Sequence, residues 1–289
     1  MKQQKLVLPW KPTHIWFIGD IQWSGIEDGV AVDHLKRTIA RALEDEAQGH
    51  TVRFIGMGDY TDFASPSNRA RLKEANLYDT ATDVIDQKAL SLVHEVYEFL
   101  KPTKGKWLGL VEGHHFYELK DGTTTDMRLC EMLGAEFFGS TGLLSLQFRR
   151  TTSTQQIGCV IWFAHGVGNG QTGYYPLTRL EKKSAEWEQV DVFAMGHTTK
   201  MVTEFQNKVF PRWAPAMDLA HRKVTLIGTG GYSKTYVLGA TQGRIPRGGY
   251  AEQKMLNAAI IGSPVLHVRP RNIGTRTTAH LQLDITAEA

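Results

Sequence analysis

Aspartate and histidine side chains follow five short apolar segments of this chain, and glycine accompanies most of them. The positions concerned are Asp20, Asp59, the pair His114-His115, His165 and His197. Carboxylate oxygens suit hard divalent cations, one carboxylate can bridge two of them, and imidazole nitrogens bind borderline transition metals. Any one of these residues alone is typical of a solvated turn. Five such positions in the same local context indicate a metal centre.

The segments that precede these residues have the composition of buried β-strands. They are short runs of apolar and β-branched residues, which predicts strands over residues 14–19, 51–55, 107–111, 160–164 and 190–195. In an open α/β sheet, ligands bind beyond the carboxyl ends of the strands. The five positions are therefore expected at such strand ends.

Helices are predicted between the first strands, and further strands are predicted after residue 137. Apolar residues recur at helical spacing over 30–48 and 80–100, and 176–187 also suits a helix. Alternation of strand and helix is typical of a layered α/β fold. Later in the chain we expect a hairpin and several short strands, over residues 143–149, 157–164, 201–205, 224–227, 264–268 and 280–285.

No linker or repeat divides the chain, so we predict one domain over residues 1–289 with inserted loops and a C-terminal β-rich extension. The glycine-rich loop over residues 166–173 lacks the ending of a phosphate-binding loop, and we expect it at the rim of the site. A turn over residues 151–156 is expected to join the two strands of the hairpin.

Charge and cysteine content narrow the functional classes. The net charge is only +3, from 33 basic and 30 acidic residues, so any affinity for nucleic acid must come from a local patch. Cys130 and Cys159 are the only cysteines, which excludes a disulfide framework and a thiolate zinc cluster and favours a reducing compartment. The sequence has no evident targeting peptide or membrane-spanning apolar run. We therefore expect a soluble, cytoplasmic protein with no membrane partner.

The order of the five blocks resembles that of the calcineurin-like metallophosphoesterase superfamily. The family pattern reads Asp-x-His, Gly-Asp-x-x-Asp, Gly-Asn-His-Asp/Glu, His-Gly and Gly-His-x-His. The matching segments here are Gly19-Asp20-Ile21-Gln22, Gly58-Asp59-Tyr60-Thr61-Asp62, Gly113-His114-His115, His165-Gly166 and Gly196-His197-Thr198-Thr199. The first block looks like the Asp-x-Gln forms common among phage-encoded members. The resemblance implies an α/β fold, a layered α-β-β-α sandwich of mixed sheets.

The resemblance also implies a role for each matching residue. Asp59 would bridge two divalent metal ions. The first metal site would be completed by Asp20 and Gln22, and the second by His114, His165 and His197. His115 would face the phosphate and protonate or hydrogen-bond the leaving oxygen, and Asp62 would orient neighbouring side chains.

The function implied is a metal-dependent phosphoesterase, more specifically a phosphodiesterase. Its substrates would be phosphodiesters of nucleotides or of DNA or RNA, attacked by a metal-bound hydroxide. Mn²⁺ is the metal we favour, with Mg²⁺, Zn²⁺, Fe and Ni left open. For a phage-encoded member the location would be the host cytoplasm.

Two departures from the family pattern support a different class of function. Gln22 and Thr199 each replace a histidine ligand, and both losses weaken the first site. A non-catalytic metal-binding scaffold with the same fold is therefore the alternative. The retained His115 argues against it, because a scaffold gains little from a leaving-group acid.

Several assignments stay open from the sequence alone. Either His114 or His115 could take the metal, although position favours His114. Arg69, Arg71 and Lys73 are typical of a solvated helical face, with a substrate-steering role as the alternative. Whether Glu118 and Asp126 orient the ligands from beside the site is left open by the sequence. Five further histidines carry no such context and are expected to be ordinary surface or core residues: His14, His34, His50, His94 and His267; His280 is likewise unassigned.

Overall fold

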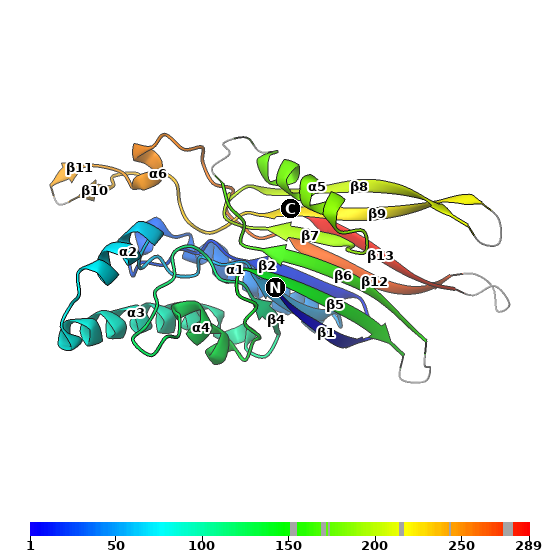
Figure 1. Cartoon of the computed structure of the whole chain (residues 1–289), viewed down its shortest axis with the longest axis horizontal. Coiled ribbons are helices and arrows are strands. Elements are labelled where there is room, and N and C mark those ends of the chain that lie inside the picture. The colour runs from blue at the N-terminus through cyan, green and yellow to red at the C-terminus, as the bar shows by residue number, and fades with distance from the viewer. Residues whose placement is uncertain (151–154, 169–171, 173, 214–216, 243, 274–279) are drawn as a thin grey trace.

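The computed structural model describes residues 1–150, 155–168, 172, 174–213, 217–242, 244–273 and 280–289. Parts of the predicted hairpin turn (residues 151–154) and of the glycine-rich loop (residues 169–171 and 173) lie outside this set. The described residues form two mixed sheets with helices on their outer faces (Figure 1).

The first sheet has five strands in the order β13-β12-β2-β3-β4. Its strands are β2 (Thr13–Ile18), β3 (Thr51–Gly56), β4 (Trp107–Leu110), β12 (Val265–Ile273) and β13 (His280–Glu288). β2, β3 and β4 are parallel, whereas β12 runs antiparallel to both β2 and β13. The three parallel strands are mostly apolar toward their carboxyl ends, because layers cover both of their faces.

The second sheet has six strands in the order β1-β5-β6-β7-β9-β8. Its strands are β1 (Lys2–Pro9), β5 (Thr141–Arg149), β6 (Gln156–Ala164), β7 (Val192–Met195), β8 (Met201–Arg212) and β9 (Asp218–Thr229). β5 and β6 form the predicted antiparallel hairpin, and β6, β7 and β9 are parallel. β7 follows β6 through helix α5 (Tyr175–Glu186), the usual connection between parallel neighbours.

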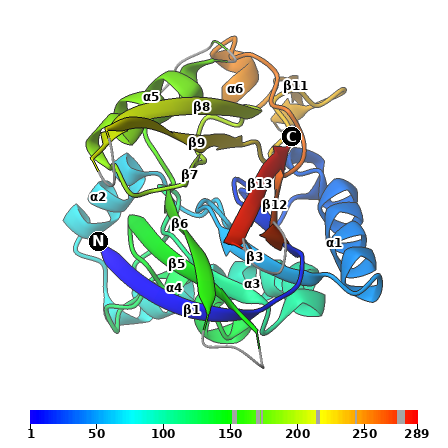
Figure 2. The same cartoon turned by 90° about the vertical axis from the view of Figure 1, so that its right-hand side faces the viewer.

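Three apolar clusters define four layers. Phe17 and Ile55 of the first sheet pack with Leu144, Phe163 and other residues of the second, so the two sheets face each other. The outer face of the first sheet packs against helices α1 (Val32–Ala47), α3 (Asp79–Leu100) and α4 (Thr125–Leu133). The outer face of the second sheet packs against α5. Figures 1 and 2 show the same order of layers, and the predicted α-β-β-α sandwich of mixed sheets is confirmed.

The smaller elements lie in the connections. They are the helices α2 (Pro66–Glu74) and α6 (Tyr250–Gln253), the short 3-10 turns η1 (Glu27–Gly29) and η2 (Lys101–Thr103), and a two-stranded ribbon of β10 (Thr241–Gln242) and β11 (Ile245–Pro246). Helix α2 begins at Pro66 after Ser65, whose hydroxyl accepts the N–H of Asn68 as an N-cap.

Among the elements that were not predicted are β1 and α4, and several strands, β8 and β9 above all, are longer than predicted. β1 pairs in parallel with β5 at the sheet edge, and most of its side chains are at least partly exposed, so it lacks the apolar run of a buried strand. α4 is a short helix that depends on its caps, Thr124 at one end and Gly134 (φ 68°) at the other. β8 and β9 extend well beyond the second-sheet core as a long antiparallel pair. Backbone pairing stabilises that extension. It was not predicted, because its residues do not form an apolar run.

Among the described residues, no helix combines the length and apolar character needed to cross a bilayer.

Candidate metal centre

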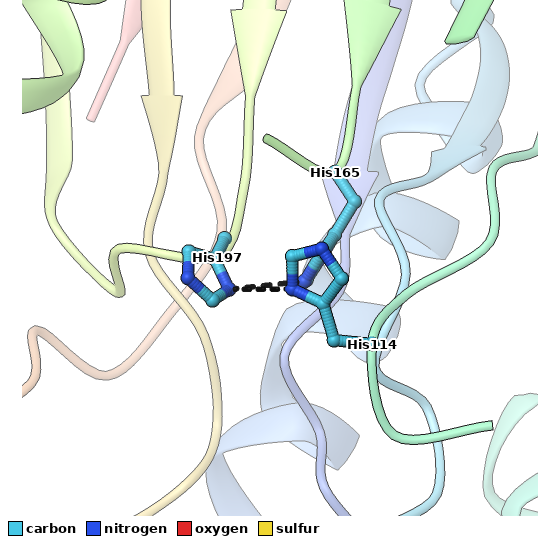
Figure 3. A group of neighbouring side chains, drawn as sticks. All are labelled: His114, His165 and His197. Carbon is cyan, nitrogen blue, oxygen red and sulfur yellow. Dashed lines mark hydrogen bonds between the residues drawn. The ribbon is translucent and has the colours of Figure 1, made fainter. Parts of the chain in front are cut away.

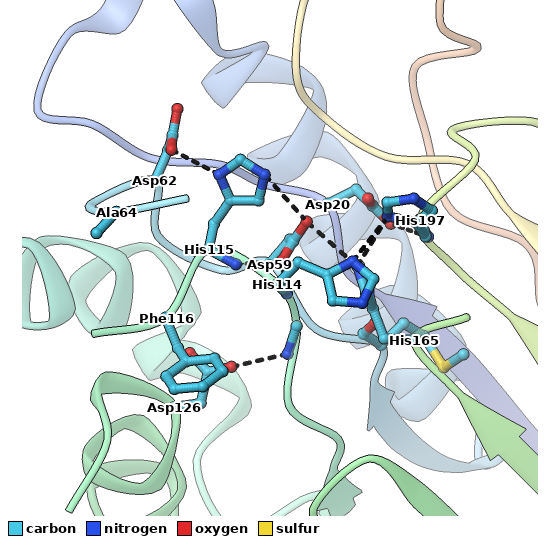
Figure 4. Close-up of polar contacts among 12 residues, drawn as sticks. Asp20, Asp59, Asp62, Ala64, His114, His115, Phe116, Asp126, His165 and His197 are labelled. Carbon is cyan, nitrogen blue, oxygen red and sulfur yellow. Dashed lines mark hydrogen bonds and ion pairs between the residues drawn. The ribbon is translucent and has the colours of Figure 1, made fainter. Parts of the chain in front are cut away.

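The predicted ligands converge where strands from both sheets end. Each lies in the loop that directly follows a parallel strand: Asp20 after β2, Asp59 after β3, His114 and His115 after β4, His165 after β6 and His197 after β7. Figure 4 shows these side chains gathered in one place. The two sheets therefore contribute to a single site.

Backbone strain is concentrated at this site. Seven non-glycine residues among those described have positive φ, and five of them belong to the predicted ligand blocks: Asp20, Gln22, Asp59, His197 and Thr199. Left-handed backbone is uncommon for non-glycine residues, although Asp and His tolerate it better than most. Such strained positions cluster at functional sites, where the surrounding structure holds them. Here the sharp turns aim side chains from neighbouring strand ends at a common point.

Three imidazoles form the centre of the site (Figure 3). Nδ1 of His114 lies 3.2 Å from Nδ1 of His197, which lies 3.3 Å from Nε2 of His165. Ligand nitrogens about 2.0–2.1 Å from a tetrahedral ion are themselves about 3.3 Å apart. The three rings therefore have the spacing of ligands around one cation.

Two aspartates extend this imidazole group into a second set of donors. Asp20, Asp59 and His165 place one donor atom each within 4.8 Å of one another, as do His114, His165 and His197. Oδ2 of Asp59 lies 3.2 Å from Nε2 of His165. His165 thus belongs to both sets, whereas the sequence assigned it to the second site only. The His/Asp group can hold metal ions, with His165 and Asp59 adjacent at its middle.

Each aspartate keeps one oxygen free of backbone hydrogen bonds. Oδ1 of Asp59 accepts the backbone N–H groups of His114 and His115, and Oδ2 of Asp20 accepts the N–H of His197. Oδ1 of Asp20 is buried and has no hydrogen-bond partner among the described residues, and Oδ2 of Asp59 is buried with only the ring of His165 facing it, at 3.2 Å. A buried carboxylate oxygen without a partner is costly unless something else binds it.

The surroundings shift the pKa values of two of these histidines, His197 and His165, in opposite directions. Burial is the main reason why the pKa of His197 falls to about 4, with His165 and His114 adding to the effect. Burial alone would also lower the pKa of His165, but the carboxylates of Asp59 and Asp20 outweigh it and raise this pKa to about 9. Metal binding at His165 requires loss of that proton, so the affinity of the site for metal is expected to rise with pH.

The aspartates respond in opposite directions. Burial raises the pKa of Asp20 to about 7. Burial acts in the same sense on Asp59, but the attraction of His165 and His115 exceeds it and holds the pKa of Asp59 below its usual range. Asp59 therefore stays ionised, as a ligand must.

His115 points to a different neighbour from His114. Its Nδ1 lies 2.7 Å from Oδ1 of Asp62, and its Nε2 lies 3.9 Å from Oδ2 of Asp59 (Figure 4). The hydrogen bond to Asp62 is the main cause of a raised pKa for His115. The ring is 27% exposed, against 3% for His165. His114 joins the imidazole group and His115 faces its border, which is the arrangement we expected; their roles stay predictions.

The two substituted positions lie beside the centre, and both have hydrogen bonds to neighbouring backbone carbonyls. The backbone N–H of Gln22, which is half-buried, donates to the carbonyl of Asp59 at 2.9 Å. The hydroxyl of Thr199 donates to the carbonyl of Thr198 at 2.8 Å. Whether either side chain binds a metal stays a prediction.

A buried carboxyl and an arginine hold the segment that carries the two histidines. Oδ2 of Asp126 accepts the N–H of Gly113 at 3.0 Å, and burial raises the pKa of Asp126 to about 7. Nη1 of Arg69 donates to the carbonyls of Ala64, His114 and Phe116 at 2.9, 2.6 and 2.8 Å. The interpretation of Arg69 as part of a solvated helical face is therefore wrong. Glu118, by contrast, pairs with Lys73 at the surface, 2.6 Å away.

Gly113 fits where no larger residue would. A Cβ atom built on it would lie 2.0 Å from the backbone nitrogen of Asp59. The loops after β3 and β4 therefore touch through their backbones, which lets Asp59 accept two N–H groups from the neighbouring loop. The glycine beside the two histidines is the sequence signal of this contact.

Comparison with known proteins adds little to this geometry. No protein-family model matches the chain, and no curated protein matches it. Among solved structures, it is similar to the sulfate thiohydrolase SoxB of Thermus thermophilus in complex with glycerol, at 10% identity and a TM-score of 0.31. That match covers 75% of this chain and 57% of the other. A likeness this distant supports no inference about activity.

Proposed function

We propose that this protein is a metal-dependent phosphoesterase of the calcineurin-like superfamily, in its Asp-x-Gln form. The observation that carries the proposal is the pair of donor sets sharing His165, with the His115–Asp62 pair at their border. Order of the ligand blocks along the chain supports the family assignment.

The donors suit two divalent cations of different character. His114, His165 and His197 would hold the second ion, where imidazole favours a borderline transition metal. Asp20, Asp59 and Gln22 would hold the first, where oxygen ligands favour Mn²⁺ or Mg²⁺. The unpartnered oxygen of Asp20 and the oxygen of Asp59 that faces only His165 support this fit. Mn²⁺ satisfies both ligand types, so we favour it over Mg²⁺, Zn²⁺, Fe and Ni.

Bound divalent cations would supply charge neutralisation and activation of water. The residues of the chain would position the cations and supply the proton for the leaving group. Asp59, ionised and held by two N–H groups, would keep the two sites in a fixed relation. His115, whose pKa is raised mainly by the hydrogen bond to Asp62, would donate its Nε2 proton to the leaving oxygen, because an imidazolium gives up a proton near neutral pH.

We propose that the substrate is a phosphodiester, of a nucleotide or of DNA or RNA. An alkoxide leaving group benefits from a proton donor, which is the support that His115 offers. A cytoplasmic location accords with the two free, buried cysteines, Cys130 and Cys159.

Hydrolysis of bis-p-nitrophenyl phosphate tests the proposal. We expect no turnover after chelation and recovery on addition of Mn²⁺. A screen of nucleotides, cyclic nucleotides and DNA would then identify the substrate class. If a folded, metal-loaded protein hydrolyses none of these, the phosphodiesterase proposal fails.

The alternative is a non-catalytic scaffold that retains metal. Gln22 and Thr199, in place of two histidines, favour it. A scaffold would bind metal with unchanged stoichiometry and show no turnover of any phosphoester, monoesters included.

A further inference from the structure

A second cluster of histidines lies at the opposite end of the first sheet. His14 is the second residue of β2, four residues before that strand ends near the candidate metal centre, and it pairs in register with His267 of β12. The ring centroid of His14 lies 4.2 Å from that of His50 and 4.4 Å from that of His267. Residues distant in sequence thus bring three imidazoles together.

A carboxylate completes the cluster. Oδ2 of Asp45, in the last turn of α1, lies 2.7 Å from Nδ1 of His14. The backbone N–H of His50 donates to the carbonyl of Asp45 at 3.2 Å, through a turn in which Gly49 has φ 94°. That turn holds Asp45 and His50 side by side between α1 and β3.

One donor of this cluster is unused. Nδ1 of His50 is buried and has no hydrogen-bond partner among the described residues. His14, Asp45 and His50 offer one ligand atom each within 4.8 Å of one another. A buried ring nitrogen without a partner, beside an imidazole and a carboxylate, is the arrangement expected of an incomplete ligand set.

We propose that His14, Asp45 and His50 form a structural binding site for a borderline transition metal ion, Zn²⁺ in particular. Two imidazoles and a carboxylate are common zinc ligands. The contact between His14 and Asp45 is shorter than the edge of a tetrahedral site, about 3.3 Å, so the two groups separate by about 0.6 Å on binding. His267 or a water molecule takes the fourth position.

The surroundings give the ion access, with charges of both signs nearby, since Arg269 also lines the approach. A surface hollow lined by His14 and His267 opens beside the cluster. Arg271, which also lines that hollow, is paired with Asp284 at 2.5 Å. Glu288 lies 3.6 Å from Nε2 of His267 and also pairs with Arg41 at 3.0 Å. The bound ion would tie the end of α1 to β2 and to the start of β3.

Zinc binding to a chain that lacks the other centre tests this site. In the background variant His165→Ala/His197→Ala, equilibrium dialysis against Zn²⁺ is expected to find about one ion per chain. Adding His50→Ala should remove that ion, whereas the control His34→Ala, an exposed histidine of α1, should leave it. Co²⁺ should give the visible absorption of a tetrahedral site in the background variant and lose it with His50→Ala.

A second measurement covers a background variant that fails to fold. In the otherwise unaltered chain, His50→Gln should lower the zinc content by about one ion per chain. It should also reduce the increase in melting temperature that Zn²⁺ produces. Unchanged zinc content in His50→Gln, or no bound zinc in the folded background variant, overturns the proposal. Loss of zinc with His34→Ala does the same. Phosphoesterase activity does not enter these readouts.

Discussion

At the scale of single residues, Asp59 has the central position in the candidate metal centre. One oxygen accepts two N–H groups from the β4 loop, and the other faces His165 and is otherwise unpartnered. Its backbone is in the left-handed region (φ 52°) and its side chain is 1% exposed. The residue is therefore held by its surroundings with one oxygen left for a ligand.

Asp59→Asn is expected to abolish hydrolysis and to lower the metal content of both sites. The amide keeps the size of the carboxyl and can still accept N–H groups, but it loses the charge that the two ions would share. Metal analysis and turnover of bis-p-nitrophenyl phosphate measure the two effects. Near-wild-type activity in the folded variant would refute a dinuclear centre.

His114→Ala and His115→Ala are expected to fail in different ways. Without His115, kcat should fall by roughly 10²–10⁴-fold while metal stays bound, because only the proton donor is lost. Without His114, metal should leave the second site. Metal content and kcat, measured on both variants, distinguish the two residues. The reverse pattern would show that His115 binds the metal and His114 is the proton donor.

Asp62→Asn should shift the alkaline limb of the pH–rate profile to lower pH. The hydrogen bond that Nδ1 of His115 donates to Asp62 is the main cause of the raised pKa of His115. His115 donates only while protonated, so activity falls as pH rises through its pKa, and a lower pKa brings that fall to lower pH. The profile of kcat against pH checks this, with His115→Ala as the control that lacks the limb. An unchanged limb would show that Asp62 does not tune His115.

At the scale of elements, α2 and α4 hold the loop that carries His114 and His115. Arg69 of α2 donates to three carbonyls of neighbouring loops, and its guanidinium lies 3.9 Å from the ring centroid of Phe116. Asp126 in the first turn of α4 accepts the N–H of Gly113. These two contacts fix a segment that has no regular secondary structure of its own.

Arg69→Met should lower the free energy of unfolding by about 1–3 kcal/mol, because three carbonyls lose a charged donor. Arg71→Met, on an exposed position of the same helix, should change it by less than about 0.5 kcal/mol. Urea unfolding of both variants measures the difference. Equal effects would mean that the contacts of Arg69 contribute nothing specific to stability.

At the scale of the whole molecule, the centre exists because two sheets pack face to face. The first sheet supplies Asp20, Asp59 and His114, and the second supplies His165 and His197. The apolar layer between the sheets sets how far apart these groups lie. The proposed first site would also draw on both sheets, since Gln22 follows β2 and Thr199 follows β7.

Gln22→His/Thr199→His should raise the metal retained after purification from about one ion per chain toward two. Each added imidazole restores a ligand at the first site, and a borderline ion such as Zn²⁺ should benefit most. Histidine tolerates the left-handed backbone of both positions. Calorimetric titration of the two proteins is the measurement. Two equally tight sites in the unaltered chain would show that another residue completes the first site.

The sequence alone determined the layered architecture and the residues that meet at the strand ends. Apolar runs that end at Asp20, Asp59, His165 and His197 are local patterns, and parallel strands necessarily bring their carboxyl ends to one edge. The order of residues after β4 favoured His114 over His115 for the imidazole group but left the choice open.

Only the tertiary structure decided what depends on contacts between distant segments. Arg69 has the composition of a solvated helix, and nothing near it in the sequence shows the three carbonyls it binds. His14, His50 and His267 have no shared pattern, yet strand register and a helix-ending turn bring them together. Local periodicity reports which face of an element is buried, whereas the partner on that face is chosen by packing across the whole molecule.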